Sequence, residues 1–209
     1  MTITQQLTPE DFQAMAKLEQ QYYPADYITP PEECYRWYLR FAPSVFCAKD
    51  EGKVVGFLNL FPIDQTMRDA LLDGIYNDAD FQAKDIVLPQ PNQTLHLFLS
   101  CAAVDPAYRN RPVMEALLQA YFLYYQELMQ TLPCQVEDVL CDTVTPEGAH
   151  LARRLGLSPF VSSNHQSQVF LPLAPAFFLP SNKNLPDERP NDKKNKPQTK
   201  QKTYLLSHS

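Results

Sequence analysis

The chain of 209 residues is predicted to form an α/β domain, with a mixed central sheet and helices on both faces. Three observations predict this class. Short apolar runs alternate with segments of helical periodicity along the chain. The longest apolar run, residues 94–104, is typical of a central strand covered on both faces. A long amphipathic helix is expected directly after it, which indicates a crossover to a parallel neighbour.

The N-terminal part is predicted to contain one strand and two helices. The strand is expected at residues 3–7. Residues 8–11 (TPED) combine an N-cap, a proline in the first turn and two acids, and they open a helix that ends at Pro24. Residues 29–33 (TPPEE) repeat this signal and open a second helix that ends at Pro43.

A β-hairpin is expected next. Strands at residues 44–49 and 54–61 flank a turn in which Gly52 supplies a positive φ. Residues 62–93 are less regular, with a helix around Met67 and loops further on. So long a connection in a compact domain is often functional.

The remaining elements follow the central strand in a regular order. A helix starts near Pro112 and ends before Pro133, and a strand is expected at residues 135–142. Residues 145–155 form a helix capped by Gly156. Two further strands are expected at 160–163 and 166–171, with a turn at Asn164 and His165.

Composition divides the chain into an acidic body and a basic tail. The net charge is −6; residues 181–209 hold seven basic and three acidic residues, and residues 1–180 hold eleven and twenty-one. We therefore expect one folded domain at 1–175 and a disordered tail rich in Pro, Lys and Asn at 176–209. An acidic body favours cationic partners such as amines and makes nucleic acid an unlikely ligand. The tail suits a solubilising role, with an anchor to an acidic partner as the alternative.

Several other classes of protein are not expected. No apolar run approaches the roughly 18–20 residues that cross a bilayer, and the N-terminus has no signal peptide, so a cytoplasmic protein without a membrane partner is predicted. Five scattered cysteines without a C-x-x-C pair indicate reduced thiols, and no metal site is expected. The sequence leaves a homodimer open.

The segment after the central strand predicts a binding site for a phosphate-bearing ligand. The strand ends at Val104, a turn follows at Asp105 and Pro106, and Arg109 and Arg111 precede the start of the next helix. A basic loop that leads into a helix brings together positive charge and free backbone N–H groups.

This segment resembles the coenzyme-A-binding motif of the GCN5-related N-acetyltransferase superfamily, Q/R-x-x-G-x-G/A. The six positions are residues 109–114 (RNRPVM), where Pro112 and Met114 replace the two small residues. Two further segments are similar to the family pattern: residues 54–58 (VVGFL) resemble its third strand, and 148–157 (GAHLARRLGL) resemble its last helix. The resemblance spans residues 2–172 and implies the mixed sheet of the acyl-CoA N-acyltransferase type.

The resemblance implies transfer of an acetyl group from acetyl-CoA to an amine of a small molecule or peptide. The fourth strand would part from the fifth and hold pantetheine between them. The residues implied at the cofactor are Ala102, Ala103, Val104, Arg109, Asn110, Arg111, Val113 and Met114. The acceptor pocket would be built by residues 24–43, 62–93 and 160–170.

The sequence offers few candidate residues for proton transfer. His96 at the start of the central strand and Asp142 at the end of the next are the predicted general bases, with water-mediated deprotonation as an alternative. The tyrosine that the family often uses as an acid is replaced by Ala152. The loss of the N–H at Pro112, the bulk of Met114 and this replacement together suggest an alternative function, a catalytically degenerate module that only binds a ligand or partner.

Overall fold

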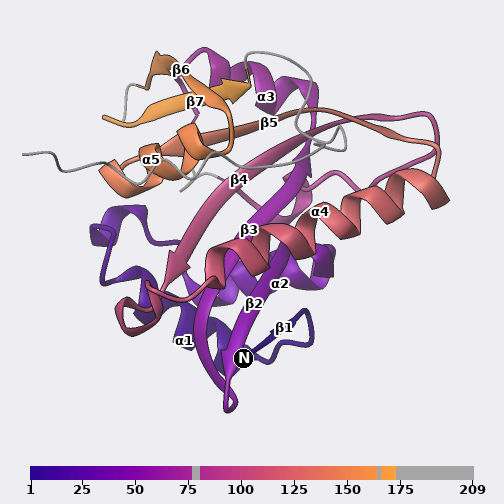
Figure 1. The fold of residues 1–209 in the computed structure, drawn as a ribbon. Helices are drawn as coiled ribbons and strands as arrows, with labels where there is room; N and C mark the ends of the chain where they lie inside the picture. Colours follow the sequence, from indigo (N-terminus) through magenta and orange to yellow (C-terminus); the bar gives the residue numbers. More distant parts are fainter. Residues whose placement is uncertain (77–80, 164–165, 173–209) are drawn as a thin grey trace, which may run out of the picture. The chain divides into compact units, whose positions relative to one another are not determined.

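The computed structural model describes residues 1–76, 81–163 and 166–172, in which one seven-stranded sheet has the order β1-β2-β3-β4-β5-β7-β6. Only β4 and β5 run parallel; the other neighbours are antiparallel (Figure 1). The strands are β1 Thr2–Thr4, β2 Val45–Asp50, β3 Lys53–Ile63, β4 Thr94–Val104, β5 Gln135–Thr143, β6 Leu157–Ser162 and β7 Gln168–Pro172.

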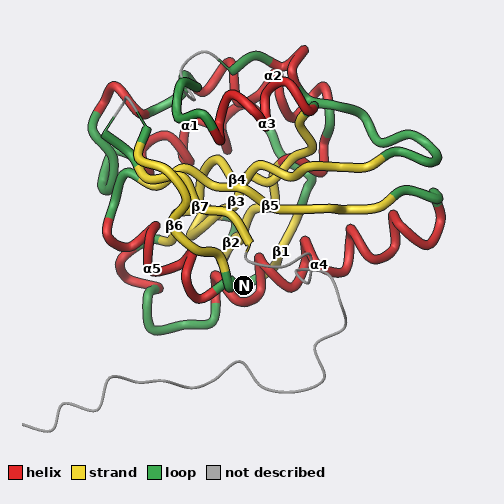
Figure 2. The backbone as a smooth tube through the Cα atoms, turned by 90° about the horizontal axis from the view of Figure 1, so that it is seen from above, coloured by secondary structure: helices red, strands yellow, loops and turns green. Residues whose placement is uncertain are grey.

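Helices cover both faces of this sheet. Figure 2 shows α4 and α5 on one side and α1, α2 and α3 on the other. The helices are α1 Pro9–Glu19, α2 Pro31–Arg40, α3 Gln65–Leu72, α4 Val113–Thr131 and α5 Pro146–Arg154, with short 3₁₀ turns at Ala25–Tyr27, Ala42–Ser44, Ala83–Asp85 and Pro106–Tyr108. The predicted fold class, a mixed sheet with helices on both faces, is confirmed. The predicted tail at 176–209 and the turn at Asn164 and His165 lie outside the described residues.

The hairpin between β2 and β3 forms through its turn residues. Glu51 and Gly52 both have positive φ, 50° and 80°, which is the type I′ geometry that matches the twist of the flanking strands. Along β3, buried residues follow one another from Val54 to Ile63, because helices pack on both of its faces.

The core on the α4 side is built around two stacked tyrosines. Tyr121 and Tyr125 are fully buried, with ring centroids 6.4 Å apart. The single Tyr121 O–H lies 2.8 Å from two carbonyl oxygens, those of Ser44 and Leu58, and the oxygen accepts from the Leu60 N–H at 3.2 Å, so the side chain ties α4 to β3 and to the turn before β2. On the opposite face, Phe12 of α1 and Trp37 of α2 are each 2% exposed.

The parallel pair of strands opens towards its carboxyl end. The β4–β5 ladder runs from Thr94 and Gln135 to Leu99 and Cys141, after which β5 pairs with β7. On the other side of β4, Leu60 faces Leu99 and Asn59 faces Cys101, so Ser100 is the extra residue of a β-bulge. The bulge bends β4 at the place where it leaves β5.

Candidate active site

A cleft of about 410 Å³ lies where β4 and β5 part. One wall is the β4 segment from Leu99 to Val104, and the opposite wall is the end of β5 and the start of α5. The end of α1 and the loop after it close one side, and the loop into α4 closes one end. This is the position of the gap that the family resemblance implied between the fourth and fifth strands.

The backbone of β4 turns alternate residues towards this cleft. The Asp105 N–H donates to the Val55 carbonyl at 2.9 Å, so the peptide groups of Ala103 and Cys101 face β3 and those of Ala102 and Val104 face the gap. The N–H group of Val104 is therefore directed towards a ligand that lies in the gap.

Two tyrosine hydroxyls already form hydrogen bonds with the backbone carbonyl groups that face the gap. The Tyr22 hydroxyl donates to the Val104 carbonyl at 2.5 Å, and the Tyr23 hydroxyl donates to the Ala102 carbonyl at 3.2 Å. Burial is the main reason why the pKa of Tyr23 is raised far above its ordinary value, so this hydroxyl remains a donor. A pantetheine group that bonds to these carbonyls has to displace the tyrosine hydroxyls.

Positive charge gathers at the end of the cleft that the loop into α4 closes, which is the end expected to hold the cofactor. Arg109 and Arg111 line it from the loop before α4. The Arg109 guanidinium lies 5.1 Å from the centroid of the Tyr22 ring, and Arg111 contacts Asp50 at 3.4 Å. Arg154 of α5 also lines the cleft and contacts Glu115 at 3.4 Å.

The start of α4 supplies backbone donors beside these arginines. Pro112 is the N-cap, and the N–H groups of Met114 and Glu115 lie in the first turn, before any intrahelical acceptor is available. Met114 lines the cleft, while the Val113 side chain is buried in the core and brings only its backbone. Asn110 is exposed and is absent from the cleft lining among the described residues.

An acidic and amide cluster lies on the wall beside Cys101. Glu19, the last residue of α1, is 7% exposed, and its carboxylate accepts a hydrogen bond from the Cys101 thiol at 3.1 Å. Burial raises the pKa of Glu19 to about 7. Asn59 of β3 is the cross-strand partner of Cys101, so both side chains project from the same face. Glu19, Asn59 and Cys101 all line the cleft.

Sequence reasoning missed both Glu19 and Asn59. Glu19 follows Phe12 by seven residues and Met15 by four, so an acid stands on the buried face of an amphipathic helix. That position was the available signal. Asn59 had a weaker one, a polar residue in the middle of an apolar strand.

Of the two predicted bases, Asp142 lies in the cleft. It lies near the end of β5, where it pairs with Val169 of β7, and it accepts a hydrogen bond from the Ser167 hydroxyl at 2.6 Å. Ser167, just before β7, is also part of the lining.

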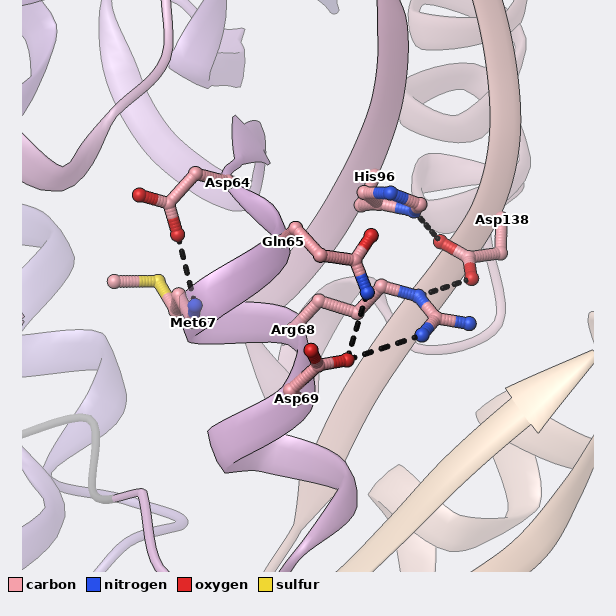
Figure 3. Close-up of polar contacts among 7 residues, drawn as sticks. All are labelled: Asp64, Gln65, Met67, Arg68, Asp69, His96 and Asp138. Carbon is pink, nitrogen blue, oxygen red and sulfur yellow. Dashed lines mark hydrogen bonds and ion pairs between the residues drawn. The ribbon is translucent and has the colours of Figure 1, made fainter.

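His96 does not lie in the cleft. Its side chain is buried near the start of β4, with Nδ1 2.8 Å from Asp138 Oδ1. Arg68 of α3 donates from Nε to the other oxygen of Asp138 at 2.8 Å, as Figure 3 shows. His96 therefore belongs to a buried ionic group that ties α3 to the sheet, at the opposite end of β4 from the gap.

The fold and the cleft define the class of protein. A mixed sheet whose single parallel pair parts beside a basic loop and a helix start is the acyl-CoA N-acyltransferase fold. The model of the Acetyltransferase (GNAT) family matches residues 12–138, and the chain belongs to this family. No curated protein matches the sequence significantly. Membership supports an acyltransferase function in general.

Within the described residues, no helix has both the length and the hydropathy to cross a membrane.

Several solved structures share the fold at low sequence identity. The GphF GNAT-like decarboxylase in complex with isobutyryl-CoA has a TM-score of 0.58 at 17% identity, with 84% of this chain and 100% of that chain covered. Ard1 from Thermoplasma volcanium has a TM-score of 0.54 at 14% identity, with 81% and 93% covered. Naa20 of Chaetomium thermophilum in complex with a bisubstrate analogue has a TM-score of 0.52 at 14% identity, with 82% and 84% covered.

Proposed function

We propose that the protein transfers an acetyl group from acetyl-CoA to an amine. The observation that carries this proposal is the parting of β4 from β5 at Leu99, directly before a strand segment whose peptide groups face a cleft. In that cleft the pantetheine arm lies along residues Ala102 to Val104. Similar structures that hold coenzyme A or isobutyryl-CoA support a ligand of this type.

The charge at the cofactor end supports the same ligand. A pyrophosphate group placed at the start of α4 meets the N–H groups of Met114 and Glu115 and the side chains of Arg109 and Arg111. Pro112 removes one donor from the loop, which costs roughly 1.5–3 kcal/mol, or a factor of about 10 to 150 in affinity. The N–H groups of Met114 and Glu115 and the two arginine side chains are the donors that remain for the pyrophosphate.

The mechanism that suits this site is direct attack of the amine on the thioester. The Val104 N–H stabilises the negative charge that develops on the carbonyl oxygen. The acceptor approaches from the side of the α1–α2 loop. A second groove there, lined by residues 26–30, 32, 33, 36 and 81–84, shares Tyr27 and Thr29 with the cleft. No group in this scheme requires a metal.

Isothermal titration with acetyl-CoA tests the proposal. We expect heat of binding at a stoichiometry of one, followed by release of coenzyme A when spermidine, tyramine or peptides with a free N-terminal serine, alanine or methionine are added. Absence of binding at millimolar acetyl-CoA would rule out the proposed function.

A second function, binding without transfer, is favoured by one specific observation. Tyr22 and Tyr23 hydroxyls fill the carbonyl positions that pantetheine needs, in a cleft whose loop also lacks the N–H of Pro112. On this reading the cleft holds another ligand or a partner segment. Coenzyme A release with any amine of the panel would contradict it.

A further inference from the structure

The wall beside Cys101 presents two oxygen acceptors with few donors. Asn59 is 3% exposed, and its Oδ1 atom has no hydrogen-bond partner in the described part of the chain. The Glu19 carboxylate accepts from the Cys101 thiol, a weak donor, and forms no ion pair with any described Lys, Arg or His. A buried carboxylate and a buried amide oxygen without a cation are costly unless a ligand supplies the donors.

We propose that Glu19 and Asn59 form the acceptor site, in which they bind the ammonium group of a primary amine and Glu19 takes its proton. This inference rests on the proposed function and names the residues that receive the acceptor. An ammonium group offers three donors and one positive charge, which match a carboxylate and an amide oxygen on one wall. Both residues flank Cys101, next to the bulge where the gap begins.

The proton balance of the step is complete. The Glu19 carboxylate accepts one proton from R–NH₃⁺ and leaves the neutral amine, whose lone pair attacks the thioester carbon. The carbon–sulfur bond breaks as the tetrahedral intermediate collapses, and the leaving thiolate receives the second proton that the nitrogen gives up. Glu19 then releases its proton to solvent. The products are the N-acetylated amine, coenzyme A and one proton.

Of the titratable groups around Glu19, the carboxyl group of Glu19 itself is the one that exchanges a proton near neutral pH. The surrounding groups are Cys101 on β4, Tyr23 in the loop after α1 and Cys34 on α2. Burial raises the pKa of Tyr23 and of Cys34 well above the ordinary values, so both stay neutral. With a pKa of about 7, Glu19 is ionised above neutrality and is still basic enough to take a proton.

Two variants test the two roles, with the amine that the wild-type protein acetylates fastest. Glu19→Gln keeps the shape of the side chain but has no basic oxygen pair, so we expect kcat/KM to fall about 10²–10³-fold. In the wild type, ionisation of Glu19 should make kcat/KM rise between pH 6 and 8. The variant should lose this rise and keep only the pH dependence that comes from deprotonation of the amine substrate. Asn59→Leu should raise the KM for the amine about tenfold or more at an unchanged pH profile.

Matched controls separate this inference from the proposed function and from misfolding. Glu10→Gln makes the same change at an exposed position of the same helix and should change nothing. All variants should bind acetyl-CoA like the wild type. A Glu19→Gln protein with kcat/KM within about threefold of the wild type, or an unchanged pH profile, would overturn the inference while acetyl-CoA binding left the proposed function standing.

Discussion

At the scale of single residues, His96 is a titratable side chain with a structural role. The imidazole and the Arg68 guanidinium each bond to one oxygen of Asp138, and His96 and Asp138 are both 6% exposed. Removal of a buried carboxylate that accepts from two donors strongly destabilises a protein, because the donors lose their partner. The expected phenotype of such a change is a less stable protein with an intact cleft.

Asp138→Asn should therefore lower the free energy of unfolding by about 3 kcal/mol, measured by urea denaturation. Acetyl transfer at a temperature where the variant stays folded should remain within about twofold of the wild type. Asp69→Asn is the matched control, since Asp69 contacts the same Arg68 at 3.5 Å but its side chain is 58% exposed. It should cost less than about 1 kcal/mol. A large loss of activity in Asp138→Asn without a loss of stability would restore a catalytic role for His96.

The predictability of the site also differs from residue to residue. Asp142 lines the cleft because it stands near the carboxyl end of β5, where β5 borders the cleft, and its role as a base stays a prediction. His96 lies outside the cleft lining, because alternation along a strand gives the face of a side chain but not its partner, which here is Asp138 of the neighbouring strand β5. Glu19 and Asn59 lie in segments that sequence assigns to core, and only the tertiary structure brings them together at Cys101.

At the scale of elements, the sequence predicts most of the fold. The bounds of β4, Thr94–Val104, equal the predicted ones, because the apolar run is bordered by Gln93 and by Asp105-Pro106. Helix starts at α1, α2 and α5 coincide with Thr-Pro or Pro-Pro signals. The bulge at Ser100 and the parting of the strands have no local signal, since both depend on which neighbours β4 has on each side.

One contact between elements sets the start of α4. Gly56 of β3 lies so close to α4 that an added Cβ atom would stand 2.9 Å from Val113 Cγ1 and 3.1 Å from the Ala103 carbonyl oxygen. Gly56→Ala should therefore push Val113 outward, lower the free energy of unfolding by about 1–3 kcal/mol and weaken acetyl-CoA binding, because Met114 moves with Val113.

Gly52→Ala provides the comparison for this variant. Gly52 has a φ of 80°, and no atom lies within 4 Å of an added Cβ, so the cost is backbone strain of about 1 kcal/mol in the hairpin turn. Both variants are measured by urea denaturation and by titration with acetyl-CoA. Gly52→Ala should lose stability and keep its affinity. Equal affinities for the two variants would show that the Gly56 contact does not position the cofactor end.

At the scale of the whole molecule, the buried carboxyl group of Glu19 makes stability depend on pH. A carboxyl group with an ordinary pKa of 4.5 in the unfolded chain has a pKa of about 7 in the fold because it is buried. Its proton is held more tightly in the folded state, so it stabilises the fold below pH 4.5, and this contribution is lost as the pH rises through 7. The protein therefore keeps an ionised Glu19 above neutrality at the expense of its own stability.

Glu19→Gln removes this titration and should be more stable relative to the wild type as the pH rises. We expect the difference in free energy of unfolding between variant and wild type to grow by roughly 2–3 kcal/mol from pH 5 to pH 8, measured by urea denaturation at both values. Glu10→Gln should show no such growth, since Glu10 is exposed and its pKa is lowered mainly by a backbone hydrogen bond. A gain in stability that accompanies a loss of acetyl transfer identifies Glu19 as a residue kept for the reaction. If the difference in free energy of unfolding between the variant and the wild type stays constant across this pH range, Glu19 is not desolvated in the folded protein.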